Sequence, residues 1–321
     1  MAARAAKVTR MRTLICGSLA FDTIMVFPDR FARHILADQA HMLSVCFTVG
    51  EMRREWGGCA GNIAYNLKAL GGDPVVMATL GKDGGDYRQR LAGLGIGIDG
   101  VTDVPDMYTA QAFIITDLDD NQITAFHPGA MGRSHDNHVT DVDGIGIGII
   151  APDGRDGMLA HAAQFHAAGI PFIFDPGQAM TLFSGDELLQ MIDVASVVTL
   201  NDYEARLLEE RTGLAQAAIA ARVDALIVTM GGEGSVIHAG GETFRIGVAD
   251  ASAIVDPTGC GDAYRAGLLY GMANGWDWQR TGQLAATLGA QKIASRGAQN
   301  HEVNRATIAA LYNQSFGSNL W

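Results

Sequence analysis

Features that would point to several other classes of protein are scarce in this chain. Its 321 residues include only four cysteines and no Cys-x-x-Cys pair, so we expect neither a disulfide framework nor a cysteine zinc site. No apolar run approaches the roughly 18 residues of a membrane span. Basic residues number 23 against 35 acidic ones, a net charge of −12, which argues against nucleic acid as a partner. A nucleotide held locally by backbone amides remains compatible with this charge.

Several catalytic motifs are missing as well. The chain has no Gly-x-x-x-x-Gly-Lys-[Ser/Thr] phosphate loop, no Gly-x-Ser-x-Gly elbow and no His-Glu-x-x-His pair. Gly146, Gly148 and Ala151 match the dinucleotide fingerprint, but these glycines lie inside an apolar strand and not at a strand-to-helix turn. We therefore discount a nicotinamide-dependent dehydrogenase. With reduced thiols and no signal peptide expected, we predict a cytoplasmic protein whose residues 1–11 form a flexible tail.

Glycine, in contrast, is abundant at 40 residues, and it separates strands and helices that alternate along the chain. The apolar patterns predict strands at 13–16, 74–80, 145–150, 171–175, 195–200, 225–229 and 235–238. They predict helices at 58–70, 87–94, 158–168, 187–192, 202–210, 262–274, 278–295 and 304–313. Such alternation predicts an α/β fold, a Rossmann-type three-layer sandwich in which helices cover both faces of a parallel sheet.

Some strand-like segments do not fit this alternation. Residues 42–49 have the pattern of a strand, and residues 110–116 and 122–127 predict a hairpin around Asp119-Asp120-Asn121. We expect a small β-sheet lid built from residues 21–56 and 106–130. The α/β domain would then comprise residues 12–20, 57–105 and 131–315.

The most informative segment is Asp256-Pro-Thr-Gly-Cys-Gly-Asp262, a glycine-rich turn that opens a helix. The first amides of a helix attract anions, and Gly259 and Gly261 would let a phosphate approach them closely. An acid in such a turn repels that phosphate, but Asp262 fits if it accepts a proton from an attacking hydroxyl. The alternative is that Asp262 is an ordinary helix-start residue.

Two further motifs contain polar groups that could form hydrogen bonds with the hydroxyls of a sugar. Gly58 and Asn62 open another predicted helix, and Asp22 follows the first strand, where ligands of open α/β sheets bind. A carboxylate there can hold two vicinal hydroxyls. For Gly58 and Asn62 a tight turn explains the pattern equally well, and a solvent-facing aspartate is the simpler interpretation of Asp22.

Two motifs near the other predicted strands are suited to a nucleotide and its metal. Asn201 and Glu204 form a helix capping box, and together they also suit the hydrated shell of Mg²⁺. Thr229-Met-Gly231-Gly232-Glu-Gly234 ends a strand in a glycine-rich loop that could face a phosphate. A hairpin turn explains that loop nearly as well.

Taken together, these motifs resemble the PfkB (ribokinase) family of carbohydrate and nucleoside kinases. The resemblance covers about residues 13–315 and looks closest to the bacterial adenosine kinases of the mycobacterial type. It is carried by the segments GSLAFDTIMVFPDRF (17–31), GGCAGNIAYNLKALGG (57–72), QITAFHPGAM (122–131), DPGQ (175–178), NDYE (201–204) and DPTGCGDAYRAG (256–267). It implies a ribokinase-like fold with a β-lid that often mediates dimerisation.

The resemblance also implies roles for individual residues. Asp262 matches the catalytic base, and Gly259, Cys260 and Gly261 match the anion hole. The sugar-binding positions match Ser18, Asp22, Gly58 and Asn62, while Phe126 and Gln178 match residues near the purine. The ATP-binding positions match Asn201, Thr229, Gly231, Gly232 and Gly234, with Mg²⁺ held through water by Asn201 and Glu204. A need for K⁺ stays open.

These observations predict an ATP- and Mg²⁺-dependent kinase that phosphorylates the 5′-hydroxyl of adenosine, with Asp262 as general base. Departures from the family lie at Cys260, Ala179 and Ala112, the last two in the expected purine pocket. Inosine, guanosine, ribose and fructose therefore remain alternative substrates. A non-catalytic nucleoside-binding protein is the remote alternative, because Asp262 and the glycines of the turn are intact.

Overall fold

The computed structural model describes residues 11–35, 45–119 and 121–321. Its larger sheet has the strand order β13-β12-β11-β10-β9-β8-β1-β4-β5. The seven strands from β5 to β11 pair in parallel, and β12 and β13 join antiparallel at one edge. The bounds are β1 Arg12–Cys16, β4 Asp73–Gly81, β5 Gly97–Val104, β8 Ile145–Ile150, β9 Phe172–Phe174, β10 Val197–Asn201, β11 Ala225–Thr229, β12 Ser235–Ala239 and β13 Glu242–Ile246.

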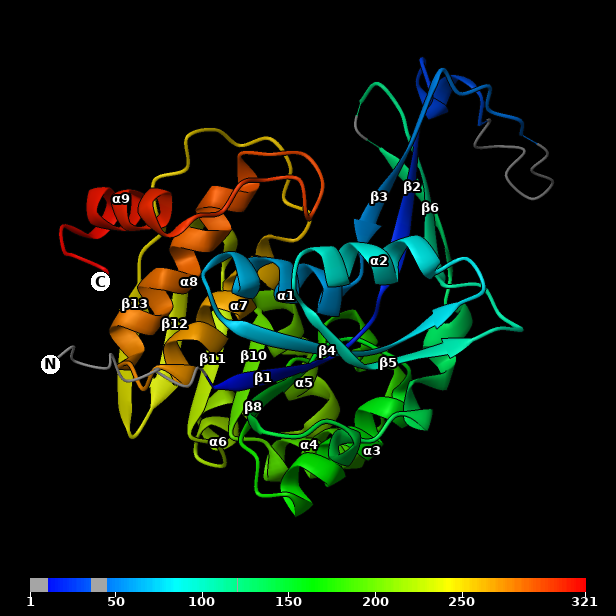
Figure 1. The fold of residues 1–321 in the computed structure, drawn as a ribbon. Coiled ribbons are helices and arrows are strands. Elements are labelled where there is room, and N and C mark those ends of the chain that lie inside the picture. Colours follow the sequence, from blue (N-terminus) through cyan, green and yellow to red (C-terminus); the bar gives the residue numbers. More distant parts are fainter. Residues whose placement is uncertain (1–10, 36–44, 120) are drawn as a thin grey trace, which may run out of the picture.

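Helices cover both faces of this sheet, as Figure 1 shows. One layer contains α1 Cys59–Ala69, α2 Gly85–Gly93, α7 Cys260–Ala273, α8 Trp278–Ile293 and α9 Arg305–Phe316. The other contains α3 Arg155–Ala167, α4 Gly185–Val194, α5 Asp202–Thr212 and α6 Gln216–Ala220. Each layer packs on its own apolar core, so the strands are buried on both sides. The expected three-layer α/β architecture is confirmed.

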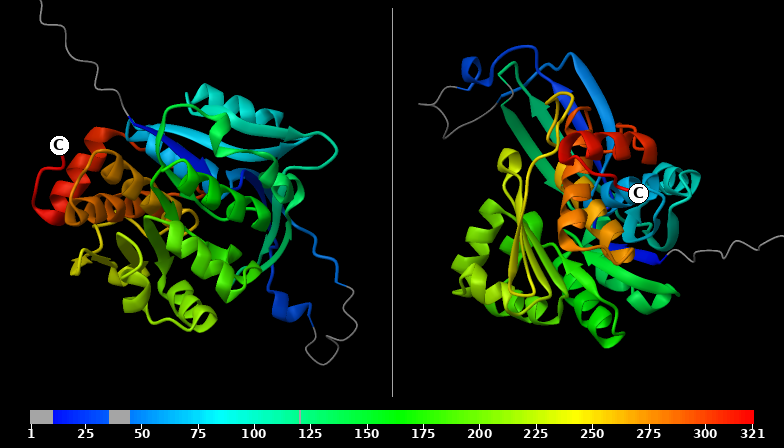
Figure 2. Two further views of the ribbon diagram at one scale, coloured as in Figure 1. Left: turned by 90° about the horizontal axis from the view of Figure 1, so that it is seen from below. Right: turned by 90° about the vertical axis from the view of Figure 1, so that its left-hand side faces the viewer.

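A second sheet has the order β3-β2-β6-β7 and projects from the body in every view (Figures 1 and 2). Its strands are β2 Ala20–Val26, β3 Glu51–Gly57, β6 Ala110–Thr116 and β7 Gln122–His127. We call these four strands the lid sheet. The expected small extra sheet and its β6–β7 hairpin are confirmed. At the base of the lid sheet, Phe21 and Trp56 pack against Tyr87 of α2, with ring centroids 5.6 and 5.0 Å from it.

The strand predicted at 42–49 is wrong over residues 45–49, and residues 42–44 lie outside the described part. The lid strand begins only at Glu51. Phe47 instead packs on Phe27 and Phe31, with ring centroids 4.8 and 5.0 Å away. Its apolar segment therefore fills a small aromatic cluster and joins no strand ladder. The tail predicted at residues 1–11 lies outside the described residues except for Met11.

Four strands and one α-helix escaped prediction: β2, β3, β5, β13 and α6. In the described residues, the structure has no helix long and apolar enough to cross a membrane.

Candidate active site

Residues that follow five parallel strands gather at one edge of the larger sheet. Ser18 follows β1, Pro152 follows β8, Asp175 follows β9, Asn201 ends β10 and Thr229 ends β11. Parallel strands share one carboxyl edge, where open α/β sheets bind ligands. All of these except Ser18 line a cavity of about 650 Å³, whose wall is completed by the start of α7.

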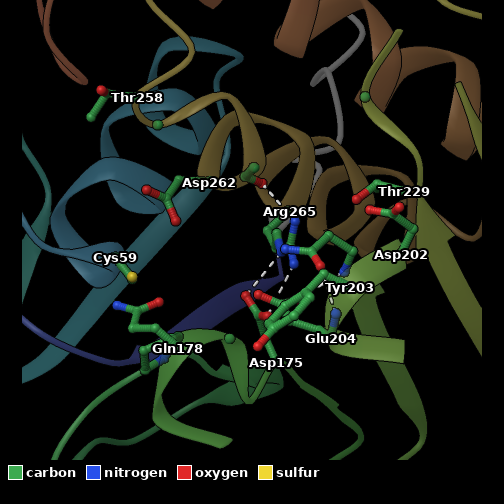
Figure 3. Close-up of a pocket in the computed structure, with 16 residues that line it drawn as sticks. Cys59, Asp175, Gln178, Asp202, Tyr203, Glu204, Thr229, Thr258, Asp262 and Arg265 are labelled. Atoms are coloured by element: carbon green, nitrogen blue, oxygen red, sulfur yellow. Dashed lines mark hydrogen bonds and ion pairs between the residues drawn. The ribbon is translucent and has the colours of Figure 1, made fainter. Parts of the chain in front are cut away.

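The cavity has two halves, shown in Figure 3. Asp262, Cys59 and Gln178 lie on one side, and Asp202, Glu204 and Thr229 lie on the other. Arg265 and Asp175 lie between them. Of the residues expected from the sequence, the cavity brings together Gly259, Gly261, Asp262, Gln178, Asn201, Glu204, Thr229 and Gly231.

The turn before α7 has the geometry of an anion site. Gly259 adopts φ 79°, and a side chain there would approach Ala298 to 2.8 Å, so only glycine fits this turn. The amide of Cys260 donates to the carbonyl of Pro257 at 3.1 Å. The amides of Gly261 and Asp262 have no such partner among the described residues. These two amides at the positive end of α7 are therefore available to an anion.

The Asp262 carboxylate lies beside these amides and accepts a hydrogen bond from Asn62 Nδ2 at 2.8 Å. Loss of solvent raises the pKa of Asp262 to about 6, although the Asn62 hydrogen bond and the Arg265 charge oppose the rise. A carboxylate with this pKa is charged at neutral pH and is a better proton acceptor than an ordinary aspartate.

Asn62 is held in one orientation by a chain of buried hydrogen bonds. Gln299 Nε2 donates to Asn62 Oδ1 at 3.0 Å and to the Tyr87 hydroxyl at 2.8 Å. Tyr87 in turn donates to the carbonyl of Gly57 at 2.6 Å. Because Gln299 occupies the oxygen of the amide, Asn62 must direct its nitrogen at Asp262.

Between the two halves of the cavity lies a buried ion pair. Arg265 Nε and Nη2 donate to the two oxygens of Asp175 at 2.9 and 3.0 Å. The Arg265 side chain is 8% exposed and that of Asp175 is 5% exposed. Arg265 is the only cationic residue among those that line the cavity. The pair joins α7 to the end of β9 and fixes their relative position.

The residues expected at the sugar are close to the start of α1. Ser18 Oγ accepts from the amide of Cys59 at 3.2 Å. Gly58 adopts φ 86°, and a side chain there would meet the carbonyl of Ser18 at 2.5 Å. A side chain at Gly57 would meet the carboxylate of Asp22 at 2.4 Å. Gly58 is thus required by packing, and Asp22 lies directly against the turn that opens α1.

Strand register places Phe126 in line with Asp22. Asp22 pairs with Ala112 across β2 and β6, and Ala112 pairs with Phe126 across β6 and β7. Paired residues share one face of a sheet, so the three side chains form a row. Burial, and then the nearby charge of Glu55, raise the pKa of Asp22 to about 6. Neither Asp22 nor Phe126 lines the cavity, and Phe126 is 53% exposed.

On the other side, Asn201 and Glu204 form a reciprocal capping box at the start of α5. Glu204 Oε2 accepts from the amide of Asn201 at 2.8 Å, and Asn201 Oδ1 accepts from the amide of Glu204 at 2.7 Å. Thr229 Oγ1 donates to the carbonyl of Leu200 at 3.3 Å. The loop after β11 turns through the positive φ of Gly231 and Gly234.

The donor groups near the expected magnesium site are carboxylate oxygens. No group of three or more His, Cys, Asp or Glu that could hold a metal directly occurs in the described residues. Asp202 and Glu204 still bring carboxylate oxygens to the cavity. Because Mg²⁺ keeps several waters and often uses few protein ligands, this oxygen set fits an ion held through water.

Comparison with known proteins identifies the family. The profile of the pfkB family carbohydrate kinases matches residues 22–305. The chain belongs to this family. It is therefore a kinase, a phosphotransferase that acts on a hydroxyl group.

Individual members of the pfkB family are similar over most of their length. A nucleoside kinase of Methanocaldococcus jannaschii is 31% identical over 251 residues, which cover 78% of this chain and 82% of that protein. The structure of Burkholderia thailandensis nucleoside kinase with inosine has a TM-score of 0.87 and 49% identity, covering 96% of this chain and 99% of that one. The same kinase with ADP-inosine has a TM-score of 0.85 and 50% identity, covering 96% and 97%.

Among the residues that line this candidate site, Asp175, Arg265 and Cys59 were not assigned from the sequence. The sequence contained a feature that could have identified Asp175, because this residue directly follows a buried strand, at the carboxyl edge where ligands bind. No such feature marks Arg265 or Cys59, since each lies within the pattern of a helix. Eight of the expected residues do not line the cavity, and these are Ser18, Asp22, Gly58, Asn62, Phe126, Gly232, Gly234 and Cys260.

Proposed function

We propose that this kinase transfers the γ-phosphoryl group of ATP to the 5′-hydroxyl of a purine nucleoside, adenosine, giving AMP and ADP. One observation carries the proposal. A carboxylate whose pKa is raised to about 6, Asp262, lies beside two amides, of Gly261 and Asp262, that have no partner among the described residues. The similarity to nucleoside kinases over nearly the whole chain supports a nucleoside as the acceptor.

In this mechanism Asp262 accepts the proton of the 5′-hydroxyl as its oxygen attacks the γ-phosphorus. The amides of Gly261 and Asp262 stabilise the charge on the transferred group. Arg265 lies between the nucleoside and nucleotide halves of the cavity, where its charge partly offsets the four carboxylates that line it, Asp175, Asp202, Glu204 and Asp262. Magnesium, held through water near Asn201 and Glu204, would neutralise phosphate charge.

We place the nucleoside between the cavity and the lid sheet. Asp22 would hold the ribose hydroxyls, with Ser18, Gly58 and Asn62 around the same turn, while Phe126 and Gln178 would contact the base. Asp22 and Phe126 do not line the cavity, and we propose that the lid formed by residues 21–56 and 106–130 closes on the substrate. Closure excludes water and limits wasteful hydrolysis of ATP.

Inosine is the second candidate substrate, favoured by the inosine complex of the 49% identical Burkholderia thailandensis kinase. An ADP-release assay across adenosine, inosine, guanosine, ribose and fructose decides between them. We expect the highest kcat/KM for adenosine. A preference for inosine would replace adenosine by another nucleoside as the proposed substrate. A preference for ribose or fructose would overturn the proposal that the substrate is a nucleoside.

Asp262→Asn tests the assigned base in the same assay. We expect kcat to fall by about 10³-fold or more, because the amide cannot accept the proton. Calorimetry should still detect adenosine binding within a few-fold of wild type. Near-normal kcat in this variant would show that Asp262 is not the base.

We further propose a cytoplasmic protein that forms a homodimer through the lid sheet, with ATP and Mg²⁺ as its cofactors.

A further inference from the structure

A buried lysine lies behind the glycine-rich turn of residues 256–262, which opens α7 and which we call the phosphate turn. The mechanism above does not use this lysine. Lys292, near the end of α8, is 0% exposed. Its ammonium donates to the backbone carbonyls of Asp256 and Ser295, both at 2.9 Å. It forms no ion pair with a carboxylate in the part of the chain that the structure describes. Lysine is almost never fully buried without such a partner, because desolvation of its charge is costly.

Lys292 lies where the segment before the phosphate turn meets the end of α8. The amides of Val255 and Asp256 both donate to the carbonyl of Ile293, at 2.9 and 3.1 Å. The segment that leads into the phosphate turn is therefore fastened to the last turn of α8. Lys292 adds a charged contact at the same junction, because one of its two acceptors lies in each segment.

The carboxylate of Asp256 extends this junction to the turn itself. Asp256 Oδ1 accepts from the amide of Thr258 at 2.9 Å, and Oδ2 accepts from the amide of Gly297 at 2.8 Å. Thr258 and Gly259 line the cavity, and Gly259 packs on Ala298 too closely to allow a side chain. The position of the Gly261 and Asp262 amides thus depends on contacts made around Asp256.

We propose that Lys292 is a positioning residue for phosphoryl transfer, whose ammonium acts as a built-in cation that holds the phosphate turn through the carbonyls of Asp256 and Ser295. Lys292 touches neither substrate and acts through the backbone. This inference rests on the proposed function, because it concerns the geometry of the anion site. Loss of the charge should lower kcat and leave nucleoside affinity largely unchanged.

Lys292→Gln tests the charge with a side chain that can still donate a hydrogen bond to one carbonyl. We expect kcat to fall about tenfold or more, since small displacements of a catalytic group cost this much, with the nucleoside KM within about twofold of wild type. Lys68→Gln, in the half-buried last turn of α1, is the matched lysine control and should keep wild-type kcat. Adenosine calorimetry on each variant confirms that it is folded.

Lys292→Ala provides an independent test, because it leaves space for a small cation between the two carbonyls. Ammonium or methylammonium chloride should restore its kcat several-fold, whereas tetramethylammonium chloride at equal ionic strength should not, and wild type should respond to none of them. A folded Lys292→Gln variant with wild-type kcat, or a folded Lys292→Ala variant that ammonium does not restore, would overturn the inference. Absence of kinase activity in the wild type would instead overturn the proposed function.

Discussion

At the scale of single residues, Asp262 balances two opposing influences. Loss of solvent raises its pKa, whereas the hydrogen bond from Asn62 and the charge of Arg265 lower it, and the result is a pKa of about 6. A much higher pKa would leave the acid protonated at neutral pH, and a much lower one would make it a poor acceptor. Asn62 therefore lowers the pKa of the proposed base, in addition to its proposed contact with the sugar.

The pH dependence of turnover follows from this pKa. Because only the carboxylate accepts a proton, kcat/KM should be maximal above about pH 7 and fall tenfold per pH unit well below pH 6. Asp22, with a pKa of about 6, should steepen the fall when its protonation weakens ribose binding. A pH profile of kcat/KM for the nucleoside, measured at saturating ATP, checks this.

Asn62→Ala should move the acidic limb of that profile to higher pH, because it removes the hydrogen bond that favours the charged form of Asp262. Asn319→Ala, an exposed position far along the chain, is the control and should leave the limb in place. A limb at unchanged pH in Asn62→Ala would show that the titrating group is not Asp262.

How far the sequence predicts the site depends on how local each contact is. Asp262 and its turn are found within seven consecutive residues, so their chemistry could be predicted directly. The pair of Arg265 and Asp175 joins residues 90 positions apart, and Gln299 reaches Asn62 across 237. Such contacts depend on tertiary packing, which no single-sequence pattern contains.

At the scale of elements, most of the strands predicted from the sequence are buried on both faces, whereas β6 and β7 of the lid sheet were predicted from the turn between them. Strands β8, β10 and β11 are continuous apolar runs because helices cover them on both sides. Strand β3 has the sequence EMRREWG and belongs to the thin lid sheet, and four of its seven residues are charged. The apolar run at 42–49 was the stronger strand signal, yet packing of Phe47 in the aromatic cluster overrode it.

Helices α4 and α5 begin with the same kind of capping box, so a role in ATP binding can be separated from a role in stability. Asn201 and Glu204 cap α5 at the cavity, and Ser184 and Glu187 cap α4 away from it. Asn201→Ala and Ser184→Ala should each lower the free energy of unfolding by about 1 kcal/mol. Denaturant unfolding measures this loss.

Only Asn201→Ala should also raise the KM for ATP, by about threefold or more, because only its helix borders the nucleotide half of the cavity. Equal changes of KM in both variants would mean that the effect is general destabilisation. No change of KM in either would remove Asn201 from the proposed ATP site.

At the scale of the whole molecule, the lid sheet has two faces with different chemistry. The pairing register places Glu55, Asp22, Ala112 and Phe126 in one row. Three residues away along each strand, Met52, Met25, Ile115 and Ile123 form a row on the opposite face. The first face carries the groups proposed for the nucleoside, and the second carries this one row that is apolar across all four strands.

The apolar row is where we expect the proposed homodimer to form. Met52 is 72% exposed and Ile123 is 41% exposed, and burial of such a row between two copies would stabilise their association. Ile123→Asp should weaken the dimer by about tenfold or more, because the charge would be desolvated at the interface. Sedimentation velocity over a range of concentrations measures the shift towards monomer.

Thr124→Asp is the matched control for Ile123→Asp, since it adds the same charge on the same exposed strand but on the face that carries Phe126. It should leave the dimer intact and instead weaken nucleoside binding. A wild-type protein that sediments as a monomer would refute the lid dimer. An Ile123→Asp variant that dimerises as tightly as wild type would place the interface elsewhere on the molecule.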